Sequence, residues 1–153
     1  MSEYLEREIP YFPCLAHRIN TTVEHSCEAS AVIAAMFDTL EMIYVFFTSS
    51  TKRYMAFQQV VKDKDIEGAL ALRNLSVTRW VARSDSITAV WASFEGIVSA
   101  LEKEMESSDA KTKIKAKNLL GKVRSFEFIV ALMFMRNVMS KTKILTKQVQ
   151  AVD

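Results

Sequence analysis

The sequence contains few of the residues that interrupt regular structure. Its 153 residues include three glycines and two prolines, and both prolines, Pro10 and Pro13, lie near the start. A β-sandwich places a turn, usually with Gly or Pro, after about every 8–12 residues. The scarcity of both residues therefore argues against such a fold and predicts long helices with few breaks.

Cysteines and long apolar runs are also scarce. The two cysteines, Cys14 and Cys27, are too few for a disulfide scaffold, and no charged-then-apolar signal peptide opens the chain. The longest uninterrupted apolar run, Phe128 to Met135, is far shorter than the ~20 residues that cross a bilayer. These features predict a soluble protein of a reducing, intracellular compartment, with no membrane partner.

The sequence offers no complete set of catalytic residues. It has no Gly-rich phosphate-binding loop, and nothing marks a cleft or an orienting third group for a Cys–His nucleophile. The carboxylates of Asp38, Glu41, Asp85 and Glu95 lie among apolar stripes, where a solvated helix face is the default role. These residues therefore give little support to enzymatic activity, and we expect no small-molecule substrate.

What the sequence does contain is helical periodicity. Half of the residues are hydrophobic and 25% are charged, which suits one domain with a real core. Between Ala31 and Phe47, one helical stripe contains Ile33, Met36, Phe37, Leu40, Ile43, Tyr44 and Phe47. The opposite side of this segment is also largely apolar, so we expect the helix to be buried on most faces.

Similar stripes cover the rest of the chain and predict an all-α bundle of about five or six helices over residues 14–153. The predicted helical segments are Cys14 to about Cys27, Ala31–Phe47, a segment from Ser49, a helix from Ser76 through Leu101, a helix from Ala116 through Met135, and a last segment from Met139 to Val149. Gly68 marks the main loop, near residues 63–75, and residues 1–13 are expected to form an extended N-terminal remnant.

Charge is distributed unevenly along the chain. Residues 1–110 contain 10 Lys and Arg against 16 Asp and Glu, a net charge of −6, whereas residues 111–153 contain 10 against 2, a net charge of +8. A basic C-terminal third on an acidic body predicts contact with a polyanion or self-association. The alternative is a lysine-rich helix face that is only solvated.

Cys14 and His17 form half of a zinc signature. On a helix the two residues face one way, and the only other local ligands are His25 and Cys27. His25 lies about 12 Å along the helix axis from His17, too far for zinc bonds of ~2.0–2.3 Å on one helix. We therefore expect no closed metal site in this chain, and a structural hydrogen bond for the histidine.

Arg79, Trp80 and Arg83 form the other notable cluster. Arg79 and Arg83 flank one helical face, with Trp80 beside it. A tryptophan can stack on an unpaired base, worth ~1–3 kcal/mol, while the arginines bind phosphate. Trp80 also shares a stripe with Ile87 and Val90, which favours the core. Both roles remain open at this stage.

Four stretches, taken in order, resemble the central part of hAT-superfamily DNA transposases, most closely the transposase-derived domains of MYM-type zinc-finger-like proteins. The stretches are CLAHRINTTV, FFTSSTKRYMAF, LRNLSVTRWVARSDSI and KVRSFEFIVALMFMRNVMSKT. The resemblance covers nearly the whole chain from Tyr11 onward. It implies the helical region that these transposases insert into an RNase H-like core, here without the core sheet.

The resemblance also implies roles for particular residues. Cys14 and His17 match the family's Cys-x-x-His motif near the active site, and Arg79 and Trp80 match its Arg-Trp motif, whose tryptophan is thought to hold DNA near the cleavage site. The catalytic acids, and the divalent metal that they hold in an intact transposase, would lie upstream of Met1 and beyond Asp153. Two features depart from the family pattern: Thr21 and Thr22 replace apolar residues, and Val77 replaces a common aspartate.

The sequence therefore predicts a truncated, catalytically inactive hAT transposase-like protein of the nucleus. It would need no cofactor and would contact DNA weakly through Arg79, Trp80, Arg83 and the basic C-terminal third. Two alternatives remain: a helical interaction or oligomerisation module, which the apolar excess of residues 31–47 and 126–135 favours, and a transposon relic without a function.

Overall fold

The computed structural model describes residues 14–63 and 80–150, which form seven α-helices and no strand. The helices are α1 (Leu15–Glu28), α2 (Ala31–Thr48), α3 (Thr51–Asp63), α4 (Trp80–Ala92), α5 (Phe94–Glu104), α6 (Ala110–Val123) and α7 (Phe126–Gln150). The all-α prediction is confirmed for these residues, but seven helices replace the predicted five or six. The predicted extended segment 1–13 and nearly all of the predicted loop at 63–75 lie outside the described residues.

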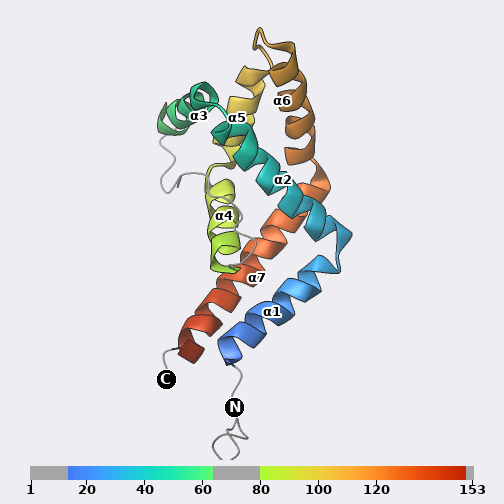
Figure 1. Cartoon of the computed structure of the whole chain (residues 1–153), viewed down its shortest axis with the longest axis vertical. Helices are drawn as coiled ribbons and strands as arrows, with labels where there is room; N and C mark the ends of the chain where they lie inside the picture. The colour runs from blue at the N-terminus through green and yellow to red at the C-terminus, as the bar shows by residue number, and fades with distance from the viewer. Residues whose placement is uncertain (1–13, 64–79, 151–153) are drawn as a thin grey trace, which may run out of the picture.

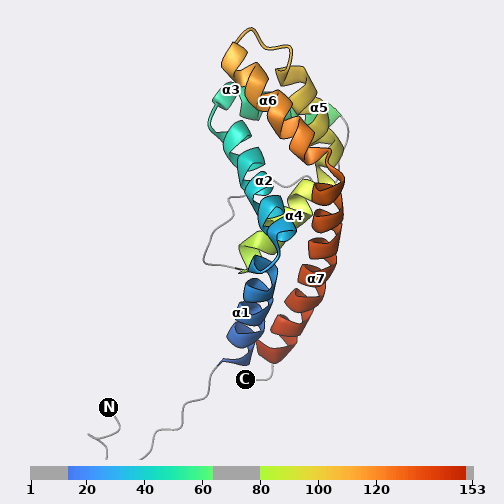
Figure 2. The ribbon, with the colours of Figure 1, turned by 90° about the vertical axis from the view of Figure 1, so that its right-hand side faces the viewer.

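The helices form an elongated bundle with two ends (Figure 1, Figure 2). At one end α1 and α4 pack against α7, and at the other α5 packs against α3 and α6. The second helix, α2, crosses between the two ends and contacts α1, α3, α6 and α7. The start of α1 and the end of α7 lie side by side at the same end of the molecule.

A single hydrophobic core runs through the bundle. The stripe predicted for α2 faces it, with Met36, Leu40, Ile43 and Phe47 at most 3% exposed. From α7 the core receives Phe128, Ala131, Leu132, Met135 and Met139. The ring centroids of Phe47 and Phe57 lie 4.8 Å apart and close the corner between α2 and α3. A fully buried side chain of this size contributes roughly 1.5–3 kcal/mol.

The helix predicted from Ser76 through Leu101 is two helices, because the chain bends at Ser93. The backbone of Ser93 (φ −97°, ψ 11°) departs from helical values. The hydrogen-bond pattern nevertheless continues across the bend, since Ser93 N–H donates to Ala89 O at 2.9 Å and Ile97 N–H donates to Ser93 O at 2.8 Å. The apolar stripe therefore keeps its period through the bend, which is why periodicity joined the two helices.

The boundary between α6 and α7 was also predicted wrongly. The expected helix from Ala116 through Met135 ends at Val123, and α7 then runs without interruption to Gln150. The Ser125 hydroxyl accepts a hydrogen bond from Phe128 N–H at 3.2 Å and so caps the first turn of α7. Ser125 followed by Glu127 is a helix-start signal, but the apolar stripe continues on both sides of it, and periodicity therefore joined the two helices.

The prediction that α2 is buried on most faces is wrong. Val32 and Val45 are 49% exposed and Met42 is 40% exposed. By length and composition α2 is the one helix among the described residues that could cross a membrane, a weak indication because core helices pass the same test. In the fold, α2 buries six residues against other helices: Met36, Thr39, Leu40, Ile43, Phe46 and Phe47.

Arg53 joins three helices at the end where α2 meets α3. Its Nε donates to Phe46 O at 2.7 Å, a carbonyl of the last turn of α2, and its Nη2 donates to Ser49 Oγ at 2.8 Å. Its guanidinium lies 4.9 Å from the centroid of the Phe46 ring, and its Nη1 donates to Thr112 Oγ1 on α6 at 3.4 Å. One arginine thus caps α2 and positions the first turn of α6.

Asp109 caps α6 next to this junction. Its carboxylate accepts hydrogen bonds from Lys111 N–H at 3.2 Å, from Thr112 N–H at 3.1 Å and from the Thr112 hydroxyl at 2.6 Å. The hydrogen bond from the Thr112 side chain, followed by those from the two backbone N–H groups, lowers the pKa of Asp109 below its usual 3.8. Thr112 therefore links the capping carboxylate to Arg53.

Replacing Arg53 with alanine should lower the free energy of unfolding by about 1.5–3 kcal/mol, because hydrogen bonds from a charged donor to partly buried acceptors are lost. Urea denaturation followed by circular dichroism measures this change. The control is Lys52→Ala, an exposed neighbour in the same turn, which should change stability by no more than about 0.5 kcal/mol. Equal effects of the two changes would contradict the assigned role of Arg53.

The Asp109 cap should make stability depend on pH in acid. A carboxyl group whose pKa folding lowers stabilises the fold above its unfolded pKa, and this contribution disappears as pH falls through the folded pKa. The difference in unfolding free energy between the wild type and Asp109→Ala should therefore be constant above about pH 5 and shrink below 3.8. Asp109→Asn is the control, because it keeps an acceptor but does not titrate. A difference that stays constant down to pH 2 would contradict the role given to the cap.

Candidate functional site

Cys14 and His17 lie at the surface, at the end of the molecule where α1 begins. Cys14 is the N-cap of α1, and its thiol makes no capping hydrogen bond. Both side chains are exposed, so neither contributes to the core. His17 lines a shallow hollow of about 240 Å³ together with other polar residues of α1: Arg18, Thr21, Thr22 and His25.

The other cysteine faces a different environment. Cys27 is buried, and its Sγ lies 3.6 Å from Met135 Sδ on α7, whereas Cys14 and His17 face solvent. Within residues 14–63 and 80–150, no three or more His, Cys, Asp or Glu side chains gather where they could hold a metal ion. The exposed Cys-x-x-His pair supplies two of the four ligands that a structural zinc site needs.

Arg83 is held inside the bundle, between α1, α2 and α4. Its Nη2 lies 3.2 Å from Glu24 Oε1, its guanidinium lies 5.2 Å from the centroid of the Phe37 ring, and its side chain is 13% exposed. Glu24 is seven residues, about 10 Å along the helix axis, from His17. A phosphate reaching Arg83 would have to compete with Glu24.

The rest of the predicted DNA-binding cluster is only partly described. Arg79 lies outside the described residues, and Trp80 is the first residue of α4, with no described side chain. Trp80 and Arg83 lie on α4 and His17 lies on α1, and the Arg83–Glu24 ion pair links these two helices.

Eight of the ten cations of the basic C-terminal third fall into two groups with different surroundings. In the first group, each cation has a partner from an earlier helix: Arg124 pairs with Glu102, Arg136 lies 4.9 Å from the Trp91 ring centroid, and Lys143 pairs with Asp85 at 3.2 Å. These cations hold α6 and α7 against α4 and α5. They help to build the fold and are less available to an external anion.

The second group forms a surface that we term the lysine ridge. It consists of exposed α6 residues: Lys111, Lys113, Lys115, Lys117 and Lys122. Because four of these lysines alternate along a helix with 3.6 residues per turn, they spread over both flanks of its solvent side. Lys122 Nζ lies 3.5 Å from Met42 Sδ on α2, so it leans toward that helix.

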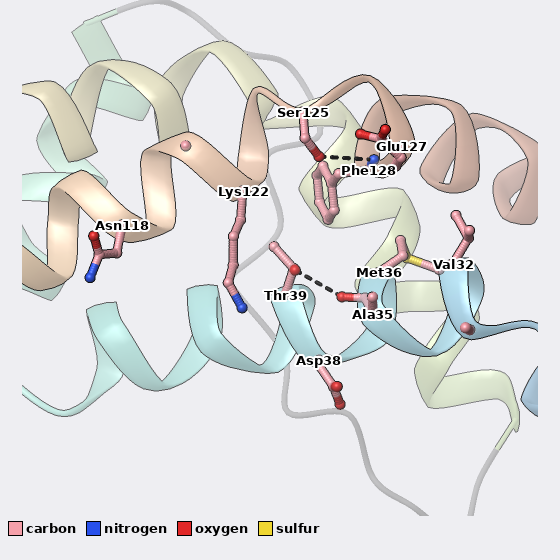
Figure 3. A pocket seen from close by; sticks show the side chains of 12 residues that line it. Val32, Ala35, Met36, Asp38, Thr39, Asn118, Lys122, Ser125, Glu127 and Phe128 are labelled. Atoms are coloured by element: carbon pink, nitrogen blue, oxygen red, sulfur yellow. Dashed lines mark hydrogen bonds between the residues drawn. The ribbon is translucent and has the colours of Figure 1, made fainter.

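A groove separates α6 from the exposed side of α2, and sequence reasoning did not foresee it (Figure 3). Its larger part, about 610 Å³, lies between the first half of α2 and the α6–α7 junction, and its smaller part, about 330 Å³, lies between the second half of α2 and α6. Asn118 lines both parts, so the two are adjacent, and between them the contact of Lys122 Nζ with Met42 Sδ crosses from one wall to the other. The sequence signals that could have indicated it are the second apolar side of α2 and Gly121 in the middle of α6.

The first turns of α7 carry a second exposed apolar surface, the outer face of α7. Its residues and exposures are Phe126 76%, Ile129 38%, Val130 39%, Met133 48% and Phe134 54%. They lie at i, i+3, i+4, i+7 and i+8, on the side opposite the core residues of the same helix. One side of the apolar stretch at residues 126–135 therefore lies in the core, and its other side lies at the surface.

These surfaces supply charge and apolar contact. The lysine ridge attracts anions, and the groove and the outer face of α7 offer apolar area to a partner. No protein-family model matches the sequence, and no solved structure matches the chain.

Proposed function

We propose that this chain is a non-enzymatic helical module that contacts DNA weakly and without sequence preference, as expected for a piece of an hAT-like transposase. The observation that carries the proposal is the lysine ridge of α6. Its five exposed lysines lie on one helix whose cap contains the single acidic residue Asp109. DNA is the polyanion that a nuclear protein of this kind would meet.

The geometry of the ridge favours phosphate contacts over base reading. Lys111 and Lys122 are 11 residues apart, about 16 Å along the helix axis, so several phosphates of one DNA strand lie within reach. Lysine is a flexible point charge and lacks the planar fork with which arginine reads guanine. Binding should therefore release counterions and depend on salt, with little discrimination among sequences.

The role proposed for Arg79, Trp80 and Arg83 is secondary. Arg83 reaches DNA only by leaving Glu24 and Phe37, and its arrangement suits a structural residue that joins α4 to α1. Arg79, outside the described residues, and Trp80, the first residue of α4, remain candidate contacts. A catalytic role is proposed for none of them.

DNA binding should weaken steeply with salt. A fluorescent 20-base-pair duplex titrated with the protein should give a Kd of roughly 10⁻⁶–10⁻⁴ M near physiological salt, with a log–log salt slope of about −3 to −4.5 if three to five phosphates are neutralised. Changing Lys113 and Lys117 to Glu should lower affinity at least tenfold and reduce the magnitude of the slope by about 2.

A matched control for this experiment is the pair Lys141→Glu and Lys147→Glu. These exposed lysines lie on α7, at the end of the molecule away from α6, and the net charge changes equally. If the control pair weakened binding as much as the ridge pair, net charge alone would explain the effect. Binding that salt does not change, or no binding at 50 mM salt, would rule out the proposed DNA contact.

The outer face of α7 supports a second candidate function, weak self-association. Fully exposed aromatic and aliphatic side chains of this kind carry up to 150–250 Å² each, so the five residues present roughly 400–500 Å². Two such faces bury about 1,000 Å² together, near the lower limit for a specific interface of about 1,200 Å². A dimer formed this way should therefore be weak and visible only at high concentration.

Met133→Glu should abolish such a dimer by placing a charge at the centre of the outer face. Light scattering on a sizing column at several concentrations measures the mass of the wild type and the variant. Ile144→Glu is the control, because Ile144 is 58% exposed on the same helix but lies outside the defined face. A wild-type chain that stays monomeric at high concentration would rule out self-association by this face.

A further inference from the structure

We infer that the groove between α2 and α6 is a docking site for an amphipathic helix of a partner protein. This inference goes beyond DNA contact, because an apolar groove with acidic residues along one wall does not suit a polyanion. Its apolar lining includes Val32, Met36 and Phe128 in the larger part and Met42, Val45 and Leu119 in the smaller part. Three of these residues, Val32, Met42 and Val45, are 40–49% exposed in the isolated chain.

The shape of the groove selects an elongated occupant. The groove follows α2 from Ala31 to Ser49, a length of about 27 Å at 1.5 Å per residue. A helix of five turns has the same length, whereas a compact small molecule would fill only one of the two parts. Helices α2 and α6 flank the groove, and the Lys122 side chain extends from α6 toward α2 between them (Figure 3). A helix lying along both parts would displace this flexible side chain.

The walls also favour a helix over an extended peptide. An extended segment binds by adding backbone hydrogen bonds to a sheet edge, and the described part of the chain has no strand. The backbone groups of α2 and α6 bond within their own helices and offer nothing to an extended backbone. A helix satisfies its own backbone and needs only side-chain anchors at i, i+3, i+4 and i+7.

Gly121 provides an independent sign of close approach. It lies in the interior of α6, lines the larger part of the groove, and is exposed. A Cβ added at this position would meet nothing within 4 Å, so the fold itself does not require glycine there. Glycine weakens a helix interior, but it lets a neighbouring backbone come close. A helix lying against α6 at Gly121 would use that space.

Charge on the two walls defines the partner further. Lys115 and Lys122 line the groove from α6, whereas Asp38 and Glu41 line it from α2. Oε2 of Glu41 is shielded from solvent and has no hydrogen-bond partner within the described part of the chain, and a rotation of this half-buried side chain would bring it to a donor on the partner helix. The partner helix should therefore carry acidic residues on the flank facing α6 and basic residues on the flank facing α2.

Synthetic 18-residue helical peptides can test this inference with the full chain. Three fluorescent peptides share a leucine face and differ in their flanks: one mixed (Glu on one side, Lys on the other), one with Glu on both sides, and one with Lys on both. Anisotropy titration should show the mixed peptide binding at least threefold more tightly than either of the others. Lys122→Glu should lower the affinity for the peptide with Glu on both sides and raise the affinity for the peptide with Lys on both sides.

Gly121→Trp should fill the groove and lower the affinity for the mixed peptide at least tenfold. The control is Lys117→Trp, a change of the same bulk on the same helix at a residue that does not line the groove. Thermal unfolding by circular dichroism should show both variants folded, since neither position is packed. DNA binding tests the lysine ridge separately, so failure of one proposal leaves the other standing.

Three results would overturn the inference. The first is no binding of any peptide at high micromolar concentration, and the second is equal weakening by the Gly121 and Lys117 variants. The third is a wild-type dimer that Gly121→Trp abolishes and Met133→Glu does not. That result would show that a second copy of this chain, rather than a foreign helix, occupies the groove.

Discussion

The core of this protein forms where α2 crosses α7, and both of these helices are apolar on more than one side. A domain of this size can bury one side of each, because only a few other helices are available to cover them. Met36, Leu40 and Ile43 of α2 and Leu132 and Met135 of α7 occupy the shared core. The remaining apolar sides become the groove beside α6 and the outer face of α7. Both candidate protein-binding surfaces therefore exist because too few helices are available to cover every apolar side of α2 and α7.

Arginines and lysines have different roles in this bundle. Arg53, Arg83, Arg124 and Arg136 each contact a carbonyl, a carboxylate or an aromatic ring of another helix. The planar guanidinium suits such contacts because it presents several donors and stacks on rings, whereas lysine is a strongly hydrated point charge. The exposed lysines of α6 have little structural role and remain free for an external anion. The chemistry of the two residues therefore separates most of the cations that hold the fold from those that can bind a ligand, and Lys143, which pairs with Asp85, is an exception.

Local pattern predicted the buried side of each helix better than the helix ends. The stripe of α2 and the buried Ile87, Val90 and Leu101 were predicted, because periodicity reports which side is apolar. The bend at Ser93 was missed, since its hydrogen bonds and stripe continue through it. Sequence alone could not show that the second side of α2 stays exposed, because that depends on how far α6 lies from it.

The candidate site was also only partly predictable, because local sequence pattern does not show which distant residues meet. Charge counting drew attention to the basic C-terminal third, but a count cannot tell which cations have partners. Arg124, Arg136 and Lys143 meet groups that are 22 to 58 residues away in sequence, and only the fold reveals this. For Arg83 the pattern gave a surface position beside Trp80, whereas the fold places it against Glu24 and Phe37. Gly121 was visible in the sequence, but its meaning depends on the empty space around it.

The pairing of α1 with the last turns of α7 has a consequence for the architecture of any larger protein that contains this bundle. Thr146 Oγ1 donates to Asn20 Oδ1 at 3.2 Å and fastens the entry and exit helices near their outer ends. A helical unit whose first and last helices end side by side can be inserted into a surface loop of another domain, because the two cut ends of that loop stay close together. It is also suited to circular permutation, in which a short linker joins these ends and new ends open elsewhere.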